Sequence, residues 1–212
     1  MDTLAQIIER VKDKFADSKG SHDWEHTERV YNLALHIGKK EKVNTTILRY
    51  AAILHDIGRV HQDTTNGKVC HAQKGAVLAR ELLHQYNVPP DQVDAIIHCI
   101  ETHRFRGNKR PESKEAQVLF DADKLDSIGA VGVGRAFLFA GEIGAKLHNK
   151  DIDIETSQAY SKEDTAYREY SVKLKNVKDR MLTHEGKRIA EGRHNFMVSF
   201  FEQLNEEVDG NR

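Results

Sequence analysis

Residues 45–58 read TTILRYAAILHDIG, an apolar segment that ends in the pair His55-Asp56 and a glycine. The apolar residues recur at the spacing of a buried helix face, so we predict a helix over 45–57 that Gly58 ends. A carboxylate on an apolar helix is costly to desolvate unless it meets a metal ion or another cation. The segment therefore predicts a packed helix with a candidate site at its end.

The composition of the whole chain points to the same class of structure. Only three prolines and fourteen glycines punctuate 212 residues, and 31% of the residues are charged. Such a composition favours long amphipathic helices over sheets, which need frequent turns. We therefore predict an all-α fold without strands. The expected helices cover about 3–15, 24–40, 45–57, 71–86, the segment after Pro90, 114–128, 129–148, 166–182 and 185–207.

The length fits one domain with an appendage. We expect residues 1–148 to form a helical core and 149–212 to form a polar, lid-like segment and two helices packed on the same domain. Residues 59–69 and 104–113 lack an apolar period and are expected to be loops. The polar stretch 149–164 is open to two interpretations, a functional lid or a surface connection without order.

Several classes of protein are excluded by charge and composition. The chain carries 32 basic and 33 acidic residues, a balance that argues against general nucleic-acid binding. It has no apolar run near 18 residues and no signal-peptide pattern, so we expect a cytoplasmic protein that does not bind membranes. Two cysteines form neither a disulfide framework nor a thiolate zinc site. The amphipathic C-terminal helices fit either core packing or a homodimer contact.

Other ionisable residues also lie on apolar helices. His26 precedes Val30 by one turn on an apolar stripe, and Asp121, Asp123 and Asp126 crowd one later helix. Singly, these features fit a hydrogen-bonded core histidine or a solvated helix face, and the His-Asp pair fits a helix cap. Together, two imidazoles and two carboxylates from three helices would form a mixed nitrogen and oxygen site. Such a site suits Mn²⁺, Mg²⁺, Co²⁺, Ni²⁺, Fe²⁺ or Zn²⁺ and leaves positions open for water and substrate.

The order of these motifs resembles the HD-domain metal-dependent phosphohydrolase superfamily. The likeness covers most of the chain, and its last stretch resembles the closing helix of a small bacterial and archaeal branch. The stretches that carry it are SHDWEHTERV at 21–30, AILHDIG at 52–58, LFDADKLDSIGAVG at 119–132 and GKRIAEGRHNFMVSFF at 186–201.

The resemblance implies a ligand set for one divalent ion. His26, His55 and Asp56 match the first three ligands. The fourth matches Asp123; helical periodicity alone does not choose between it and Asp121. Adjacent residues at a helix end can share an ion, whereas neighbours within a helix diverge by about 100°.

The resemblance also implies a second layer around that ion. His71 and His103, with His98 as the competitor of the latter, match residues that bind a second ion or contact substrate phosphate. Asp126 would orient a ligand or accept a proton. Arg59 stands where some nucleotide-cleaving relatives carry a glutamate. The basic residues expected to bind substrate are Lys74, Arg104, Arg106, Lys124 and Arg59.

The implied function is hydrolysis of a phosphoester or phosphoanhydride bond by water activated by a divalent ion. The expected substrate is a small phosphorylated metabolite, best fitted by a nucleotide. Two alternatives remain: a di-iron oxygenase on the same fold, which needs a full second ligand set, and a nucleotide-binding or sensing module without turnover.

Overall fold

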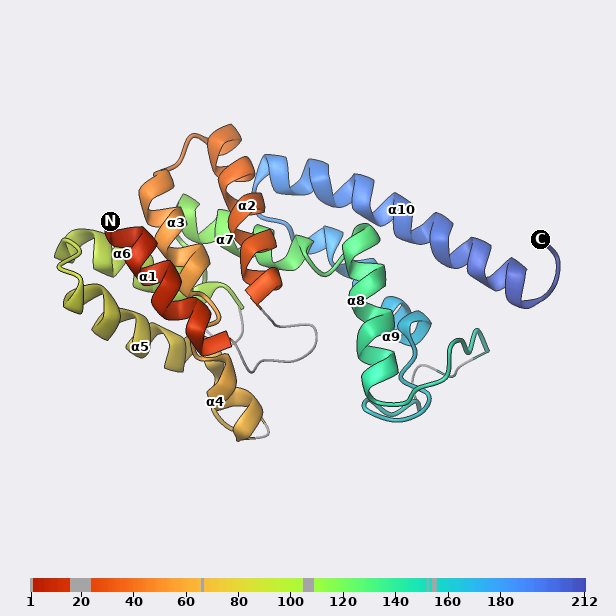
Figure 1. The fold of residues 1–212 in the computed structure, drawn as a ribbon. Coiled ribbons are helices and arrows are strands. Elements are labelled where there is room, and N and C mark those ends of the chain that lie inside the picture. The colour runs from red at the N-terminus through yellow and green to blue at the C-terminus, as the bar shows by residue number, and fades with distance from the viewer. Residues whose placement is uncertain (1, 16–23, 66, 105–108, 152, 154–155) are drawn as a thin grey trace. The chain divides into compact units, whose positions relative to one another are not determined.

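The computed structural model describes residues 2–15, 24–65, 67–104, 109–151, 153 and 156–212. Within these ranges the regular structure is entirely helical and no strand occurs, which confirms the predicted all-α class. The chain separates into two compact units, Met1–Asp123 and Lys124–Arg212. The predicted division at residue 149 stays a prediction. Figure 1 follows the chain through both units.

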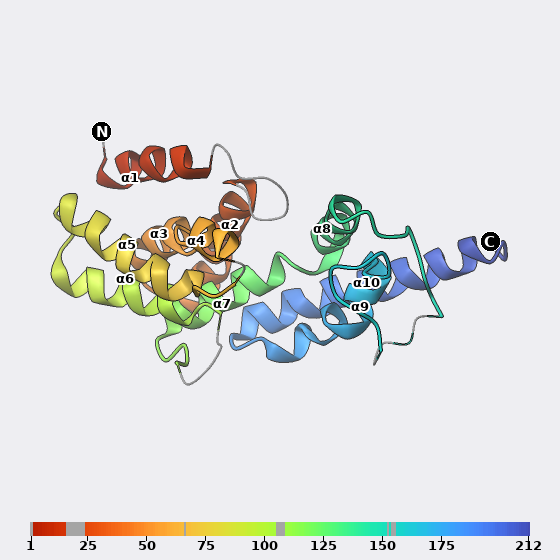
Figure 2. The same cartoon turned by 90° about the horizontal axis from the view of Figure 1, so that it is seen from below.

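The N-terminal unit is a set of packed helices. Helix α2 lies against α3, α3 against α6, and α5 against α6, as the two views in Figures 1 and 2 agree. The largest side chains of its core have less than 2% of their surface exposed, among them Leu48, Leu54 and Phe120. The helices are α1 (Thr3–Lys12), α2 (Trp24–Glu41), α3 (Thr45–Leu54), α4 (Arg59–Thr64), α5 (His71–Gln85), α6 (Pro90–Thr102) and α7 (Lys114–Leu125), with a 3₁₀ turn at Asp13–Phe15.

Helix α3 begins and ends at residues that fix its position. The side chain of Asn44 caps its first turn by accepting hydrogen bonds from the amides of Thr46 and Ile47, at 3.0 and 3.4 Å. The helix ends at Leu54, three residues earlier than expected. His55 and Asp56 therefore lie in the turn that follows α3 rather than on its surface.

The close approach of two backbones brings this turn against α5. A Cβ atom on Gly58 would lie 2.5 Å from the backbone nitrogen of Gly75 and closer still to the carbonyl oxygen of His71. Only a residue without a side chain fits between these backbones. The contact places the first residue of α5 beside the turn that carries Asp56.

The segment after Gly58 differs from its prediction. Residues 59–69 were expected to form a loop, but Arg59–Thr64 form helix α4. None of its residues is buried, so the sequence has no apolar period from which this helix could be predicted. Local bonds support it instead: Thr64 Oγ1 donates to the carbonyl of Val60 at 2.8 Å, and Arg59 Nε lies 3.2 Å from Asp63 Oδ1.

The C-terminal unit packs helix α8 (Gly129–Glu142) against α9 (Ala166–Val172) and α10 (His184–Val208). Thr183 Oγ1 caps α10 by accepting a 3.0 Å hydrogen bond from the amide of Gly186. The predicted helix 166–182 was wrong in its length, because two 3₁₀ turns follow α9 at Leu174–Asn176 and Lys178–Arg180. The buried residues of that segment follow one another at spacings of three and four, which imitates a helix; they are Leu174, Val177 and Met181.

The described part of the polar stretch 149–164 has no helix and is held by hydrogen bonds. Arg168 is 8% exposed and donates to Asp164 Oδ1 at 2.7 Å and to Ser157 Oγ and O at 2.8 and 3.0 Å. A role as a lid stays a prediction.

Among the described residues, no helix combines the length and the apolar character that a bilayer crossing requires. The cytoplasmic location and the homodimer stay predictions.

Candidate metal centre

Helix ends in the N-terminal unit bring four histidines and two aspartates together. All except Asp123 are at most 4% exposed. They form two groups in which the possible ligand atoms lie within 4.8 Å of one another, namely His26, His55 and Asp123, and Asp56, His71 and His103.

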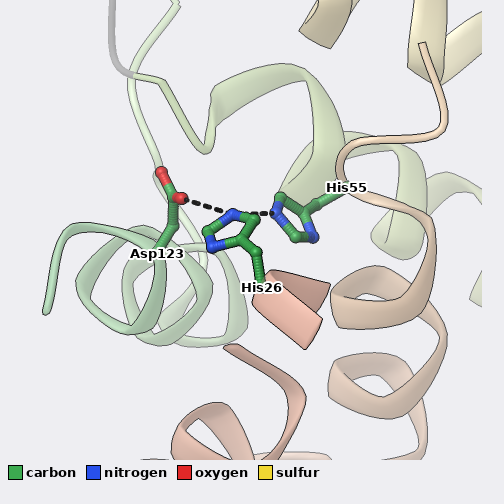
Figure 3. A group of neighbouring side chains, drawn as sticks. All are labelled: His26, His55 and Asp123. Atoms are coloured by element: carbon green, nitrogen blue, oxygen red, sulfur yellow. Dashed lines mark hydrogen bonds and ion pairs between the residues drawn. The ribbon is translucent and has the colours of Figure 1, made fainter. Parts of the chain in front are cut away.

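The first group joins α2, the turn after α3, and α7. Figure 3 shows the ring of His26 between the other two side chains. Its Nε2 atom lies 3.5 Å from Asp123 Oδ1 and 3.3 Å from His55 Nε2. Asp121 is fully buried and belongs to neither group. The geometry thus favours Asp123 as the fourth ligand, a role that stays a prediction.

The second group joins the same turn to the start of α5 and the end of α6. His71 Nε2 lies 3.1 Å from Asp56 Oδ1 and 3.0 Å from His103 Nε2. His103 Nε2 lies 3.8 Å from the same carboxylate oxygen. The competing residue, His98, points elsewhere, since its Nε2 accepts a 3.1 Å hydrogen bond from the amide of Glu112.

Asp56 lies between the two groups and faces both. Its Oδ2 atom is 3.7 Å from His26 Nε2 and 3.8 Å from His55 Nε2, whereas Oδ1 faces His71 and His103. One carboxylate therefore offers an oxygen to each group, the arrangement expected of a ligand shared by two ions.

The hydrogen bonds of the ring Nδ1 atoms fix which nitrogen faces inward as an acceptor. His55 Nδ1 lies 2.8 Å from the carbonyl oxygen of Ala52, and His103 Nδ1 lies 2.7 Å from that of Ile100. A carbonyl only accepts, so each Nδ1 must carry a proton, and Nε2 is then the nitrogen that can offer a lone pair. Metal-binding histidines in proteins commonly have this arrangement, in which the other ring N–H donates to a backbone carbonyl.

Burial keeps the second pair of rings neutral. Desolvation lowers the pKa of His71 to about 2, against the opposing charge of Asp56. It lowers the pKa of His103 to about 4, against the opposing charge of Asp123. Neutral imidazole is the form that binds a metal ion. Two facing lone pairs beside a carboxylate oxygen fit a cation, so the residues present suit a divalent ion.

Basic side chains lie near the second group. Arg104 Nη1 donates a 2.9 Å hydrogen bond to Gln62 Oε1, which lies 3.0 Å from His71 Nδ1. Arg59 pairs with the exposed Asp63, as described above for α4. Lys74 is half-buried in α5, one turn after His71.

Three predicted residues belong to the other unit or lie outside the described residues. Arg106 lies outside the described residues. Lys124 and Asp126 belong to the C-terminal unit, where Asp126 Oδ2 accepts a 2.7 Å hydrogen bond from Arg135 Nη1. Their roles stay predictions.

Sequence reasoning missed Gln62, which touches both His71 and Arg104. It lies in a segment without an apolar period, and no motif marks it. The contact between Gly58 and Gly75 was missed for a similar reason, because a glycine that ends a helix does not show which backbone it meets.

Comparison with known proteins gives a consistent result. Residues 23–128 match the HD domain family. The chain is 37% identical over 210 residues to YpgQ of Bacillus subtilis, with 97% of this chain and 93% of YpgQ covered. The crystal structure of YpgQ in complex with ADP superimposes with a TM-score of 0.74 at 32% identity, covering 97% of this chain and 94% of that one.

Two further relatives extend this comparison. An HD-superfamily hydrolase from Bacillus thuringiensis has a TM-score of 0.76 at 27% identity, covering 97% of this chain and 96% of its own. Ribonuclease Y of Chloroflexus aurantiacus is 30% identical over 122 residues, which are 58% of this chain but 21% of that enzyme. The last similarity is thus confined to a part of a longer protein.

Proposed function

This chain belongs to the HD-domain family, and on that basis we propose that it is a metal-dependent phosphohydrolase acting on a small phosphorylated metabolite. The bond to be cleaved is a phosphoester or a phosphoanhydride. The observation that carries the proposal is the position of Asp56, whose two oxygens each face a pair of inward-pointing imidazoles. The ADP complex of YpgQ supports a nucleotide as the substrate class.

Each of the two groups would bind one divalent ion. His26, His55, Asp56 and Asp123 would hold one divalent ion. Asp56 would also bind a second ion, together with His71 and His103. A divalent ion in such a site supplies Lewis acidity and lowers the pKa of bound water toward neutrality. Nitrogen and oxygen donors suit manganese, iron, cobalt, nickel, zinc or magnesium.

The chain's own cations would bind the phosphate. Arg104 lies beside the second group, and the hydrogen bonds it makes there, to Gln62 and to Cys70 Sγ, both come from Nη1. A guanidinium presents five donors in a planar fork, so its remaining donors match phosphate oxygens. Arg59 and Lys74 would add positive charge, and Arg106 and Lys124 are further candidates for the same role. Such donors stabilise the charge that develops on the phosphate in the transition state.

A di-iron oxygenase is the second candidate, because residues that the resemblance assigns to a second ion lie together. The possible ligand atoms of Asp56, His71 and His103 lie within 4.8 Å of one another. The two candidates differ in the metal they use and in the co-substrate they consume, so both can be measured on one preparation.

The test is metal analysis of the purified protein combined with product analysis. Nucleoside mono-, di- and triphosphates are incubated with added Mn²⁺, Mg²⁺, Co²⁺ or Ni²⁺, and released phosphate and pyrophosphate are measured. We expect metal-dependent release that is lost in His55→Ala and Asp56→Ala. Two irons per chain with oxygen uptake and no release would favour the oxygenase. Nucleotide binding without turnover would show a binding module and refute both enzymes.

A further inference from the structure

A single side-chain oxygen links the second group of ligands to a nearby cation. Gln62 lies on α4, and its Oε1 atom is 3.0 Å from His71 Nδ1 and 2.9 Å from Arg104 Nη1. Its side chain is half-buried. The same amide therefore contacts a candidate metal ligand and a candidate phosphate-binding residue.

The contact with Arg104 fixes the orientation of the amide. A guanidinium only donates hydrogen bonds, so the Gln62 atom that faces it must be the carbonyl oxygen and not the NH₂ group. That oxygen also lies 3.0 Å from His71 Nδ1, and it can accept a hydrogen bond from the neutral ring only when the ring carries its proton on Nδ1. In that tautomer the lone pair of His71 lies on Nε2, toward Asp56 and His103.

The opposite placement of the proton would close the group to an ion. With its proton on Nε2, His71 would donate to Asp56 Oδ1, which is 3.1 Å away. The ring would then occupy the carboxylate oxygen that a second ion needs, and its lone pair would point away from the group. His103 has a backbone carbonyl to prevent this, but His71 has only a side chain.

We propose that Gln62 is a positioning residue that keeps the proton of His71 on Nδ1 and thereby keeps the second group open to a divalent ion. The inference rests on the proposed function, because it concerns the same site. Since the same oxygen holds Arg104, Gln62 also fixes a phosphate-binding side chain beside that ion. The Gln62 amide thus links the binding of an ion in the second group to the position of Arg104.

The direct test reads the proton on His71 in the metal-free protein. Long-range ¹H–¹⁵N correlation spectra show which ring nitrogen is protonated, and comparison with His71→Gln assigns the signals. We expect Nδ1–H in the wild type and in Gln62→Glu, which keeps an oxygen acceptor. In Gln62→Leu we expect the proton to move to Nε2. The matched control is Gln73→Leu, an exposed glutamine on α5, which should leave the spectrum of His71 unchanged.

A second readout is the binding of Mn²⁺ without nucleotide, measured by isothermal titration calorimetry. Loss of a residue that orients a metal-binding histidine typically weakens metal affinity about 10–100-fold. We expect that loss for the second Mn²⁺ in Gln62→Leu, with the first Mn²⁺ unaffected. Gln62→Glu and Gln73→Leu should bind both ions as the wild type does. Thermal unfolding of each variant shows that it is folded before the titration.

Three outcomes would overturn the inference: an Nε2-protonated His71 in the wild type, a proton that stays on Nδ1 in Gln62→Leu, or unchanged affinity for the second Mn²⁺ in that variant. Failure of the proposed function looks different. In that case no nucleotide is hydrolysed, while the proton and the second Mn²⁺ still respond to Gln62→Leu.

Discussion

Replacement of Asp56 by asparagine should remove two ions at once, because Asp56 faces both ligand groups. Its Oδ2 atom lies 3.7 Å from His26 Nε2, and its Oδ1 atom lies 3.1 Å from His71 Nε2. The substitution keeps the size of the side chain but removes its charge and one oxygen. By contrast, Asp123→Asn should affect only the first group and His71→Gln only the second.

The size of the effect follows from mass action. An ion that binds only the folded protein stabilises it by about 2.7 kcal/mol when its concentration is a hundredfold above Kd. For a chain of this length, 1 kcal/mol shifts Tm by roughly 2–4 °C. Each Mn²⁺ should therefore raise the Tm of the wild type by roughly 5–11 °C. The increase should fall to about half in the two single-group variants and to zero in Asp56→Asn.

The assay is differential scanning calorimetry with and without Mn²⁺, on protein first treated with a chelator. Asp91→Asn, at an exposed aspartate on α6, is the control and should keep the full increase. If Asp56→Asn lost no more of the increase than Asp123→Asn does, the carboxylate would not be shared, and the division into two groups would be wrong.

Three further predictions test other parts of the site. Asp121→Asn should spare Mn²⁺ binding in calorimetry far better than Asp123→Asn; the reverse order would assign the last ligand to Asp121. The metal-free protein should lose stability in urea unfolding as the pH falls from about 6.5 toward 4. In this pH range the unfolded state protonates both histidines of the second group, whereas burial keeps them neutral in the folded state. Each histidine then lowers the free energy of unfolding by about 1.4 kcal/mol per pH unit. His103→Gln should reduce that slope, and an unchanged slope would contradict the assigned pKa of its ring. Gly58→Ala should destabilise the protein by about 1–3 kcal/mol, because its Cβ meets backbone atoms. Gly134→Ala, with no atom within 4 Å of the added Cβ, should instead stabilise α8 by about 0.5–1 kcal/mol, and equal effects of the two substitutions would refute the packing argument.

The sequence located the helices that bury an apolar face, although some of them end earlier than predicted: α3 at Leu54 instead of 57, and α8 at Glu142 instead of 148. Periodicity predicted α2 as 24–40, and the structure has Trp24–Glu41. Periodicity failed where burial gives no helical signal or a false one. Helix α4 buries nothing, and the segment after α9 buries Leu174, Val177 and Met181 at helical spacing without being an α-helix. Periodicity reports which residues are buried, and it reports the backbone conformation only where the two coincide.

The candidate ligands were predictable for a different reason. Histidines and aspartates on apolar segments are conspicuous, and their order along the chain matches a known family. The residues that orient them carry no such mark. Gln62 is one polar residue among several in α4, and its contact with His71 depends on how two backbones meet, which no local pattern encodes.

The glycine after the His-Asp pair connects these two kinds of information. In sequence it is a residue that ends a helix, and α3 does end nearby, at Leu54. In the structure its missing side chain also admits the backbone of α5 at His71 and Gly75. That approach brings His71 Nε2 to 3.1 Å from Asp56. Because Asp56 lies in the turn after α3, its carboxylate faces both ligand groups. The contact of Gly58 with α5 places His71 in the second of these groups. The His-Asp-Ile-Gly motif therefore supplies Asp56, the proposed shared ligand, and also Gly58, whose contact with α5 places His71 beside it.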